Sequence, residues 1–262
     1  MATINVPIMA DVFSSGERPE YLYWVGCAGA FDDRYKKVAR AFTKLLHYTN
    51  TSYAVLGTEE TCNGDPARRA GNEMLFQMQA IQVIELLKMY EVKKILTTCP
   101  HCYNIFKNEY PDLGGKYEVY HHSQFLKGLM DSKQIPINPE IFAGQTITYH
   151  DPCYLGRGNG EYQAPRDILN ALPAAKTEIE KNRSFALCCG AGGAQMFKEA
   201  EPGKKEVYAE RTEQVIATGA DIVATACPFC MTMLTDGLKY KDKSEEIKNY
   251  DLAELIVISL GI

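Results

Sequence analysis

The nine cysteines of this chain form two copies of one pattern, and this duplication restricts the fold more than any other feature. The first copy comprises Cys27, Cys62, Cys99 and Cys102, and the second comprises Cys153, Cys188, Cys189, Cys227 and Cys230. Corresponding cysteines are 126 residues apart at the first two positions and 128 apart in the Cys-x-x-Cys motif. The spacing predicts two related halves, and thiols placed so regularly usually share an inorganic centre.

The composition is that of a globular protein in a reducing compartment. The 262 residues are 46% hydrophobic and 23% charged, enough to bury a core, and the net charge of −5 argues against nucleic acid as a partner. Residues 1–20 lack a basic start followed by an apolar run, and the apolar stretch 255–262 is too short to cross a bilayer. We therefore expect a cytoplasmic protein that does not insert into a membrane and reaches one only through a partner. Such a compartment disfavours disulfides and favours metal or redox chemistry.

Strand and helix patterns alternate along the whole chain. The predicted strands are 21–25, 53–56, 94–98, 118–120, 146–149, 185–187, 222–226 and 248–250. The predicted helices are 34–48, 66–90, 103–109, 123–131, 165–171, 204–218, 231–237 and 252–259. This alternation predicts an α/β protein of two pseudo-symmetric, Rossmann-like halves with mainly parallel sheets. We divide it into an N-terminal arm 1–20, a first half 21–132, a linker 133–144 and a second half 145–262.

The cysteines follow the predicted strands. Cys27, Cys99, Cys153 and Cys227 each come at or just after a strand end. Because ligands of parallel sheets bind at the carboxyl ends of the strands, distant loops can deliver sulfur to one point in each half. The two Cys-x-x-Cys motifs open helices, whose N-terminal N–H groups stabilise thiolates. Glycines after the cysteine pair allow the backbone to approach a bulky group, and we expect them to bind the cofactor: Gly190, Gly192 and Gly193.

Three kinds of thiol chemistry compete for these residues. A structural zinc suits the four cysteines of the first half, but five cysteines with an adjacent pair fit tetrahedral zinc poorly. Thioredoxin-like dithiol exchange suits the Cys-Pro-His-Cys motif at 99–102 but leaves Cys27 and Cys62 without a task. Iron–sulfur chemistry explains the additional thiolate, so we rank it first, with zinc second.

Several polar residues lie close to the cysteine motifs. His101 and His150 are candidates for proton transfer or for tuning a potential, with loop hydrogen bonding as the alternative for each. Arg68, Arg69 and Arg157 could offset cluster charge or remain solvated. The helical spacing of apolar residues in 66–90 predicts an ordinary core helix, with these members: Met74, Leu75, Met78, Ile81, Ile84 and Leu87.

The second cysteine set resembles a known family. Its pattern Cys-x34-Cys-Cys-x37-Cys-x-x-Cys is similar to the CCG domain of the heterodisulfide reductase catalytic subunit family. The tandem arrangement is most similar to oxidoreductases that pass electrons between electron-transfer flavoprotein and quinone. Three segments carry the resemblance, which extends from Tyr21 to the C-terminus: residues 59–69, 150–157 and 188–193.

The resemblance implies a cofactor and its ligands. In the family, five cysteines bind a noncubane [4Fe-4S] cluster, here assigned to Cys153, Cys188, Cys189, Cys227 and Cys230. The first half departs from the pattern, because Thr61 stands where the first cysteine of the pair is expected. Its four cysteines then leave three outcomes open: a second iron–sulfur cluster (or zinc), an empty thiol site, or a vestigial half.

The resemblance also implies a function within a larger assembly. We expect the iron–sulfur subunit of a multi-subunit oxidoreductase, heterodisulfide-reductase-like, that links electron-transfer flavoprotein and quinone. The alternatives are an electron relay in a lactate, glycolate or glycerol-3-phosphate oxidising complex, and a zinc-stabilised scaffold. The chain has no dinucleotide fingerprint, no P-loop and no ferredoxin-type Cys-x2-Cys-x2-Cys run. Electrons must then come from a ferredoxin-like or membrane-bound partner subunit.

Overall fold

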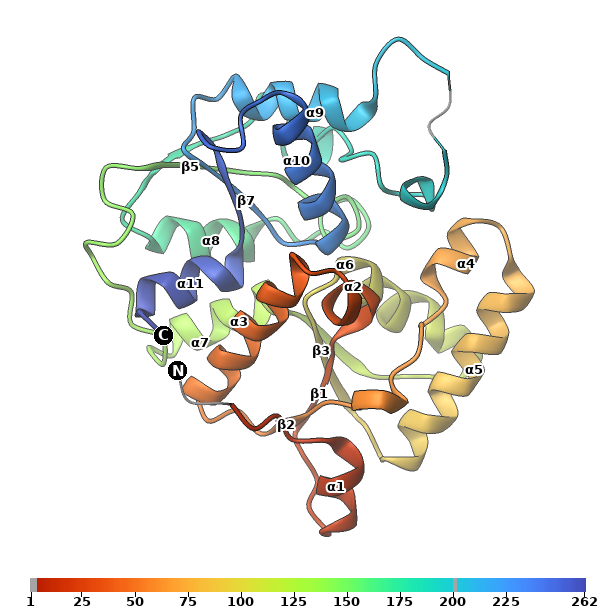
Figure 1. Ribbon diagram of the computed structural model, residues 1–262. Helices are drawn as coiled ribbons and strands as arrows, with labels where there is room; N and C mark the ends of the chain where they lie inside the picture. The colour runs from red at the N-terminus through yellow and green to blue at the C-terminus, as the bar shows by residue number, and fades with distance from the viewer. Residues whose placement is uncertain (1–3, 200–201) are drawn as a thin grey trace. The chain divides into compact units, whose positions relative to one another are not determined.

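The computed structural model describes residues 4–199 and 202–262 (Figure 1). The chain divides into two compact units, Met1–Phe125 and Leu126–Ile262, here called the N-terminal and C-terminal units. Each unit is built around its own sheet of four parallel strands.

The N-terminal sheet has the strand order β2-β1-β3-β4. Its strands are β1 (Tyr21–Trp24), β2 (Tyr53–Ala54), β3 (Lys94–Thr97) and β4 (Glu118–His121). The two central strands are buried along almost their whole length, which is why they consist of apolar runs rather than alternating residues. β1 and β3 pair in parallel with Leu22 opposite Ile95.

The C-terminal sheet repeats this order as β6-β5-β7-β8. Its strands are β5 (Thr146–Tyr149), β6 (Ala175–Thr177), β7 (Ile222–Thr225) and β8 (Lys248–Asp251). The central strands β5 and β7 pair in parallel with Ile147 opposite Ile222. The two identical topologies confirm the prediction of two α/β halves with parallel sheets.

One predicted strand was wrong. Residues 185–187 do not pair with a sheet: Arg183–Phe185 is a 3₁₀ turn, and the Phe185 side chain is 84% exposed. The edge position is taken by β6, in which Ala175 pairs with Thr146. β6 is largely exposed and has no apolar pattern, so backbone pairing with β5 holds it in the sheet.

The helices follow the predicted order, with a few additions and one division. They are α1 (Met9–Ser14), α2 (Gly26–Phe31), α3 (Tyr35–Tyr48), α4 (Asp65–Arg69), α5 (Glu73–Met89), α6 (Pro100–Asn104), α7 (His122–Asp131), α8 (Gln163–Ala171), α9 (Val207–Ile216), α10 (Pro228–Tyr240) and α11 (Leu252–Leu260). A π-helix, Ile105–Glu109, continues from α6. In the C-terminal unit α9 and α10 lie on one side of β5 and β7, and α8 and α11 lie on the other (Figure 1). None of the helices in the described ranges is long and apolar enough to cross a membrane.

The segment predicted as one helix, 66–90, is two. Gly71 has a φ of 86°, which ends the α4 turn, and the Asn72 side chain accepts a hydrogen bond from the Leu75 N–H at 3.0 Å to cap α5. The prediction that this segment is an ordinary core helix holds for Leu87 but not for its N-terminal turns, where Met74 is 74% and Met78 54% exposed.

The described part of the N-terminal arm packs against the first sheet. The Met9 N–H donates to the Val55 carbonyl at 2.8 Å, and the Val55 N–H donates to the Pro7 carbonyl at 2.9 Å. The Met9 side chain is buried. Residues 1–3 of the predicted arm lie outside the described residues.

The close approach of α9 and α10 generates a stability prediction. A Cβ on Gly237 would lie 1.9 Å from Thr212 Oγ1, whereas a Cβ on Gly128, in α7, would meet nothing within 4 Å. We expect Gly237→Ala to lower the free energy of unfolding by about 1–3 kcal/mol through overpacking. Gly128→Ala should raise it by up to about 1 kcal/mol, since alanine favours a helix. Urea denaturation of both variants tests this, and equal effects would contradict it.

Candidate metal centre

The cysteine loops of each unit lie at the point where the strand order reverses. In the N-terminal sheet β1 and β3 are neighbours, although β2 separates them in sequence. Cys27 lies in α2, which begins two residues after β1, and Cys99 is the N-cap of α6 after β3. Chain segments after such neighbouring strands leave toward opposite sides and open a crevice at their carboxyl ends.

The C-terminal unit repeats this placement. Cys153 follows β5, and Cys227 is the N-cap of α10, which follows the adjacent strand β7. Cys230 lies in the first turn of α10, and the Cys188-Cys189 pair lies in the loop before α9. Three loops from distant parts of the sequence therefore supply five sulfur atoms at one end of the sheet.

The five sulfurs of the C-terminal unit form one continuous set of contacts. The Cys153 and Cys189 thiols each donate a hydrogen bond to Cys188, and the Cys230 thiol contacts Cys189 and Cys227. Cys189, Cys227 and Cys230 are at most 4% exposed. The structure thus brings together all five predicted ligands, which is the donor set that an iron–sulfur centre requires.

The thiols of this set differ in their acidity. Cys188 accepts hydrogen bonds from Cys153 and Cys189 and from the Gly190 N–H at 3.3 Å, which lowers the pKa of Cys188 well below its ordinary value. The pKa values of Cys153 and Cys189 are raised, because both donate to Cys188 and are buried. Hydrogen bonds to Cys188 therefore favour its thiolate over its thiol, which is the form that binds metals.

The glycine loop after the pair shapes the backbone around Cys188. Gly190 has a φ of 98°, and a Cβ there would lie 3.3 Å from the Tyr208 amide nitrogen. A Cβ on Gly192 would lie 4.0 Å from Cys188 Sγ. Gly190 and Gly192 therefore keep the backbone close to this sulfur, while Gly193, with a φ of 66°, turns the chain away.

His150 lies beside the sulfur set. One of its ring nitrogens and the Sγ atoms of Cys189 and Cys230 all lie within 4.8 Å of one another. Its Nδ1 accepts a hydrogen bond from Arg211 Nε at 2.9 Å. Burial, together with the charge of Arg211, lowers the pKa of His150 to about 3.

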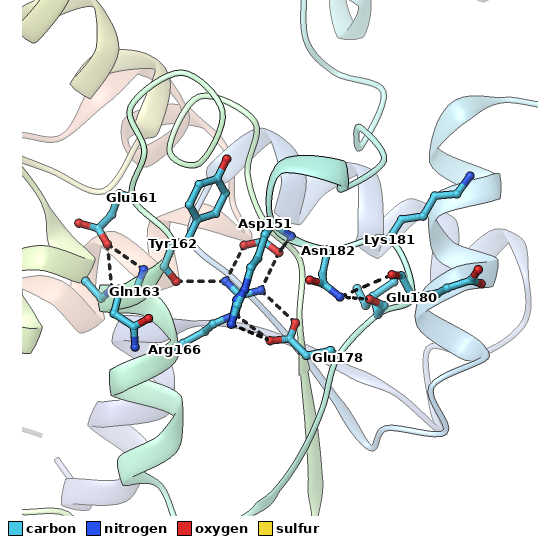
Figure 2. A network of polar contacts seen from close by, with 12 residues as sticks. Asp151, Glu161, Tyr162, Gln163, Arg166, Glu178, Glu180, Lys181 and Asn182 are labelled. Carbon is cyan, nitrogen blue, oxygen red and sulfur yellow. Dashed lines mark hydrogen bonds and ion pairs between the residues drawn. The ribbon is translucent and has the colours of Figure 1, made fainter.

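A second buried arginine of this unit is fully paired. Arg166 lies between two carboxylates: Nη1 and Nη2 donate to Asp151 at 2.7 and 2.9 Å, and Nε donates to Glu178 at 2.7 Å (Figure 2). Asp151 also accepts from the Arg183 N–H at 2.8 Å. This network fixes the segment between β5 and Cys153 to α8 and to the loop after β6.

The N-terminal unit gathers its four thiols in the same way. Cys102 donates to Cys99, and the charges of Cys99 and Cys62 act on Cys27. Loss of hydration among the surrounding atoms and these neighbours raise the pKa of Cys27 to about 12, although its side chain is still exposed, and partial burial raises the pKa of Cys62. The predicted first-half residues Cys27, Cys62, Cys99 and Cys102 therefore lie near one another at this end of the sheet.

The surroundings of the first thiol set are acidic. The buried Asp65 accepts from His101 Nδ1 at 2.9 Å and from Arg69 Nε at 3.0 Å. Glu60 accepts from the Gly26 N–H at 2.6 Å, and burial raises the pKa of Glu60 to about 7. His101 is thus engaged by Asp65 within this unit, rather than being a free proton donor.

The three arginines predicted near the cysteines have other partners. Arg68 pairs with Glu109 at 2.8 Å, and Arg69 pairs with Asp65 and with Glu109. Arg157 Nη1 donates to the Ala186 carbonyl at 2.5 Å. These ion pairs and this hydrogen bond hold neighbouring chain segments together.

The structural repeat shows which member of the cysteine pair the first half lacks. The Gly64 N–H donates to Cys62 Sγ at 3.4 Å, as the Gly190 N–H donates to Cys188 Sγ at 3.3 Å. Cys62 therefore corresponds to Cys188, and the buried Asn63 stands in place of Cys189. This corrects the expectation that Thr61 replaces a cysteine, because Thr61 precedes the equivalent pair and is exposed.

Sequence reasoning missed Arg211, Asn63 and Arg166. Arg211 is fully buried in α9, and the only signal was a base four residues before the buried Val215, on the same face of the helix. Asn63 could have been found from the 126-residue spacing of the two copies, which pairs it with Cys189 just as it pairs Gly64 with Gly190.

The fold and the duplicated thiol sites define a class of protein. The pattern of the CCG family, described as a cysteine-rich domain, matches residues 21–107 and 147–235, one copy in each unit. These matches cover more than half of the chain. The chain therefore belongs to the CCG cysteine-rich domain family, with two domains in tandem.

Several known proteins are similar to nearly the whole of this chain. A probable iron-sulfur-binding oxidoreductase FadF from Bacillus subtilis is 44% identical over 98% of this chain and 36% of its own length. An EtfAB:quinone oxidoreductase from Syntrophomonas wolfei is 45% identical over 92% of this chain and 34% of its own length. A dihydromethanophenazine:CoB–CoM heterodisulfide reductase component from Methanosarcina barkeri is 34% identical over 94% of this chain and 60% of its own length. This chain thus spans about a third of the first two relatives.

The Arg166 network predicts a large loss of stability when it is broken. Arg166→Met leaves the buried Asp151 carboxylate without its ion-pair partner, which should lower the free energy of unfolding by about 3–5 kcal/mol. The control is Arg18→Met, which removes an exposed ion pair with Glu91 and should cost less than about 1 kcal/mol. Urea denaturation of both variants measures the difference, and losses of the same size would contradict the prediction.

Proposed function

We propose that this chain is the iron–sulfur part of a larger electron-transfer oxidoreductase. The proposed cofactor is a noncubane [4Fe-4S] cluster bound by Cys153, Cys188, Cys189, Cys227 and Cys230. The observation that carries the proposal is the continuous contact of these five sulfurs at the carboxyl end of one sheet. Tetrahedral zinc would leave one of the five thiols without a metal.

The donor set and its surroundings fit such a cluster. When bound, an iron–sulfur cluster supplies one-electron transfer. The protein supplies thiolates, the Gly190 N–H on Cys188, and the N-terminal turn of the 13-residue helix α10 beside Cys227. Burial of Cys189, Cys227 and Cys230 excludes water from one side of the set.

The electron partners are proposed from the relatives and from the sequence. The chain lacks a nucleotide fingerprint and a ferredoxin-type cysteine run, so another subunit or domain must exchange electrons with it. Relatives named as an EtfAB:quinone oxidoreductase and as part of a heterodisulfide reductase support electron-transfer flavoprotein, quinone or a disulfide at the two ends of the path. Turnover of small disulfides with a strong one-electron donor separates a reductase from a relay, since a relay should give none.

The first thiol site is proposed to hold a different centre. It offers four thiols and has Asn63 in place of the fifth. The nearby Asp65 and Glu60 disfavour additional negative charge, so a centre with fewer thiolates fits better there. A conventional cluster and zinc are the two candidates.

Serine variants of the two sites should have separate effects. Cys189→Ser should remove the main cluster, because Cys189 lies between Cys188 and Cys230, and with it most of the bound iron. Cys62→Ser should leave that cluster intact and remove only iron or zinc bound by the N-terminal unit. Iron, sulfide and zinc analysis with Mössbauer spectroscopy after anaerobic purification measures both. Unchanged spectra of Cys189→Ser would contradict the ligand assignment.

The position of the missing fifth thiol can be tested by restoring it. Asn63→Cys should increase the iron bound by the N-terminal unit, since it creates the adjacent pair at the buried position equivalent to Cys189. Thr61→Cys, the matched control, adds an exposed thiol two residues away and should change the iron content little. Iron analysis is done in a Cys189→Ser background, which removes the main cluster, so that the remaining iron is that bound by the N-terminal unit. A larger gain from Thr61→Cys would overturn the alignment.

A further inference from the structure

Arg211 is a buried cation for which the described part of the chain provides no paired anion. Its side chain lies in α9 and is 0% exposed. Nε donates to His150 Nδ1 at 2.9 Å, and Nη1 donates to the Lys181 carbonyl and to Gln214 Oε1, both at 2.8 Å. All of these acceptors are neutral. Nη2 has no hydrogen-bond partner among the described residues.

The other buried arginine of the unit shows how unusual this is. Arg166 forms ion pairs with Asp151 and Glu178 (Figure 2). Asp151 is therefore already engaged, in a bidentate pair with Arg166. A guanidinium taken out of water without a counter-charge is strongly unfavourable, so proteins rarely bury one. The negative charge nearest in effect to Arg211 is that of Asp151, which is held by Arg166, and the next groups in effect are the sulfurs of Cys230 and Cys189.

The hydrogen bond from Arg211 also fixes the proton on His150. A guanidinium N–H can only donate, so Nδ1 of His150 must be the acceptor and the neutral ring carries its proton on Nε2. A ring nitrogen of His150 lies within 4.8 Å of Cys189 and Cys230 Sγ. The Nε2–H of the ring, which does not face Arg211, is therefore the group that can donate a hydrogen bond.

The pair belongs to the second site alone. Counting back by the spacing of the cysteine copies places Trp24 at the position of His150, where it packs on Phe106 with ring centroids 4.8 Å apart. Because the spacing of the copies changes from 126 to 128 residues along the chain, the residue equivalent to Arg211 is Val83, Ile84 or Glu85, and none of these is basic. The fold forms in the N-terminal unit without either residue, so the fold itself does not require the pair.

We propose that Arg211 and His150 set the reduction potential of the cluster in the C-terminal unit. Arg211 is the buried counter-charge of the anionic cluster and a positioning residue for His150. The Nε2–H of His150 donates a hydrogen bond to a cluster sulfur. Both effects stabilise the reduced cluster, because reduction adds negative charge. The inference rests on the proposed function, since it needs a cluster at these five cysteines.

The test is a redox titration of the loaded protein, followed by EPR. Arg211→Met should make the cluster at least tenfold harder to reduce at a given potential, a shift of about 59 mV or more to negative values for a one-electron couple. Arg211→Lys keeps the charge and should shift the potential less. The matched control is Thr212→Val, a neutral change at the neighbouring buried residue of α9, which should leave the potential unchanged. The proposal would be overturned if Arg211→Met binds the cluster and the reduction potential of the cluster equals that of the wild-type protein.

A second measurement does not require that any Arg211 variant binds the cluster. In wild-type protein with ¹⁵N-labelled histidine, pulsed EPR of the paramagnetic cluster should detect a weakly coupled histidine nitrogen that disappears in His150→Gln. A loaded cluster without this coupling would overturn the inference even if no Arg211 variant binds iron. Iron analysis separates this result from a failure of the proposed function. If the proposed function is wrong, the wild-type protein contains no cluster.

Discussion

The convergence of sulfur atoms at the carboxyl ends of parallel strands is the constraint on which the structure of this protein depends. In each sheet the two central strands are neighbours in space but not in sequence, so the loops that follow them open a crevice. Cysteines follow both strands, and the chain segment that connects the two strands supplies the others. Folding each sheet therefore brings its cysteines together at one end, and in the C-terminal unit the Gly190 N–H donates a hydrogen bond to Cys188 Sγ.

The two units use one topology to build two electrostatically different sites. The N-terminal thiols lie near the buried Asp65 and Glu60, and the pKa values of Cys27 and Cys62 are raised. In the C-terminal set the pKa of Cys188 is lowered by hydrogen bonds, and the set lies beside His150 and the cation of Arg211. Opposite charge environments favour centres of different net charge. The duplication thus preserved the scaffold, while the residues around the sulfurs diverged.

Much of the fold could be predicted because hydrophobic runs and turn residues are local signals. The central strands were found because they are buried on both faces, and α10 because Cys227-Pro228 is a strong helix start. The edge strand β6 was missed, since its residues are mostly exposed and backbone pairing alone keeps them in place. The apolar face of α5 was predicted to be core, yet Met74 and Met78 are exposed, because periodicity does not tell which face a neighbour covers.

The sequence by itself determined the duplication, the number of thiols in each half and their positions after strands, because these depend only on residue identity and spacing. Tertiary structure alone decided which side chains surround the sulfurs. Arg211 is 61 residues from His150, and the matching glycine hydrogen bonds on Cys62 and Cys188 show that these two sulfurs occupy equivalent places in the two sites. Such relations depend on packing between distant segments, and no local pattern encodes where a buried charge finds its partner.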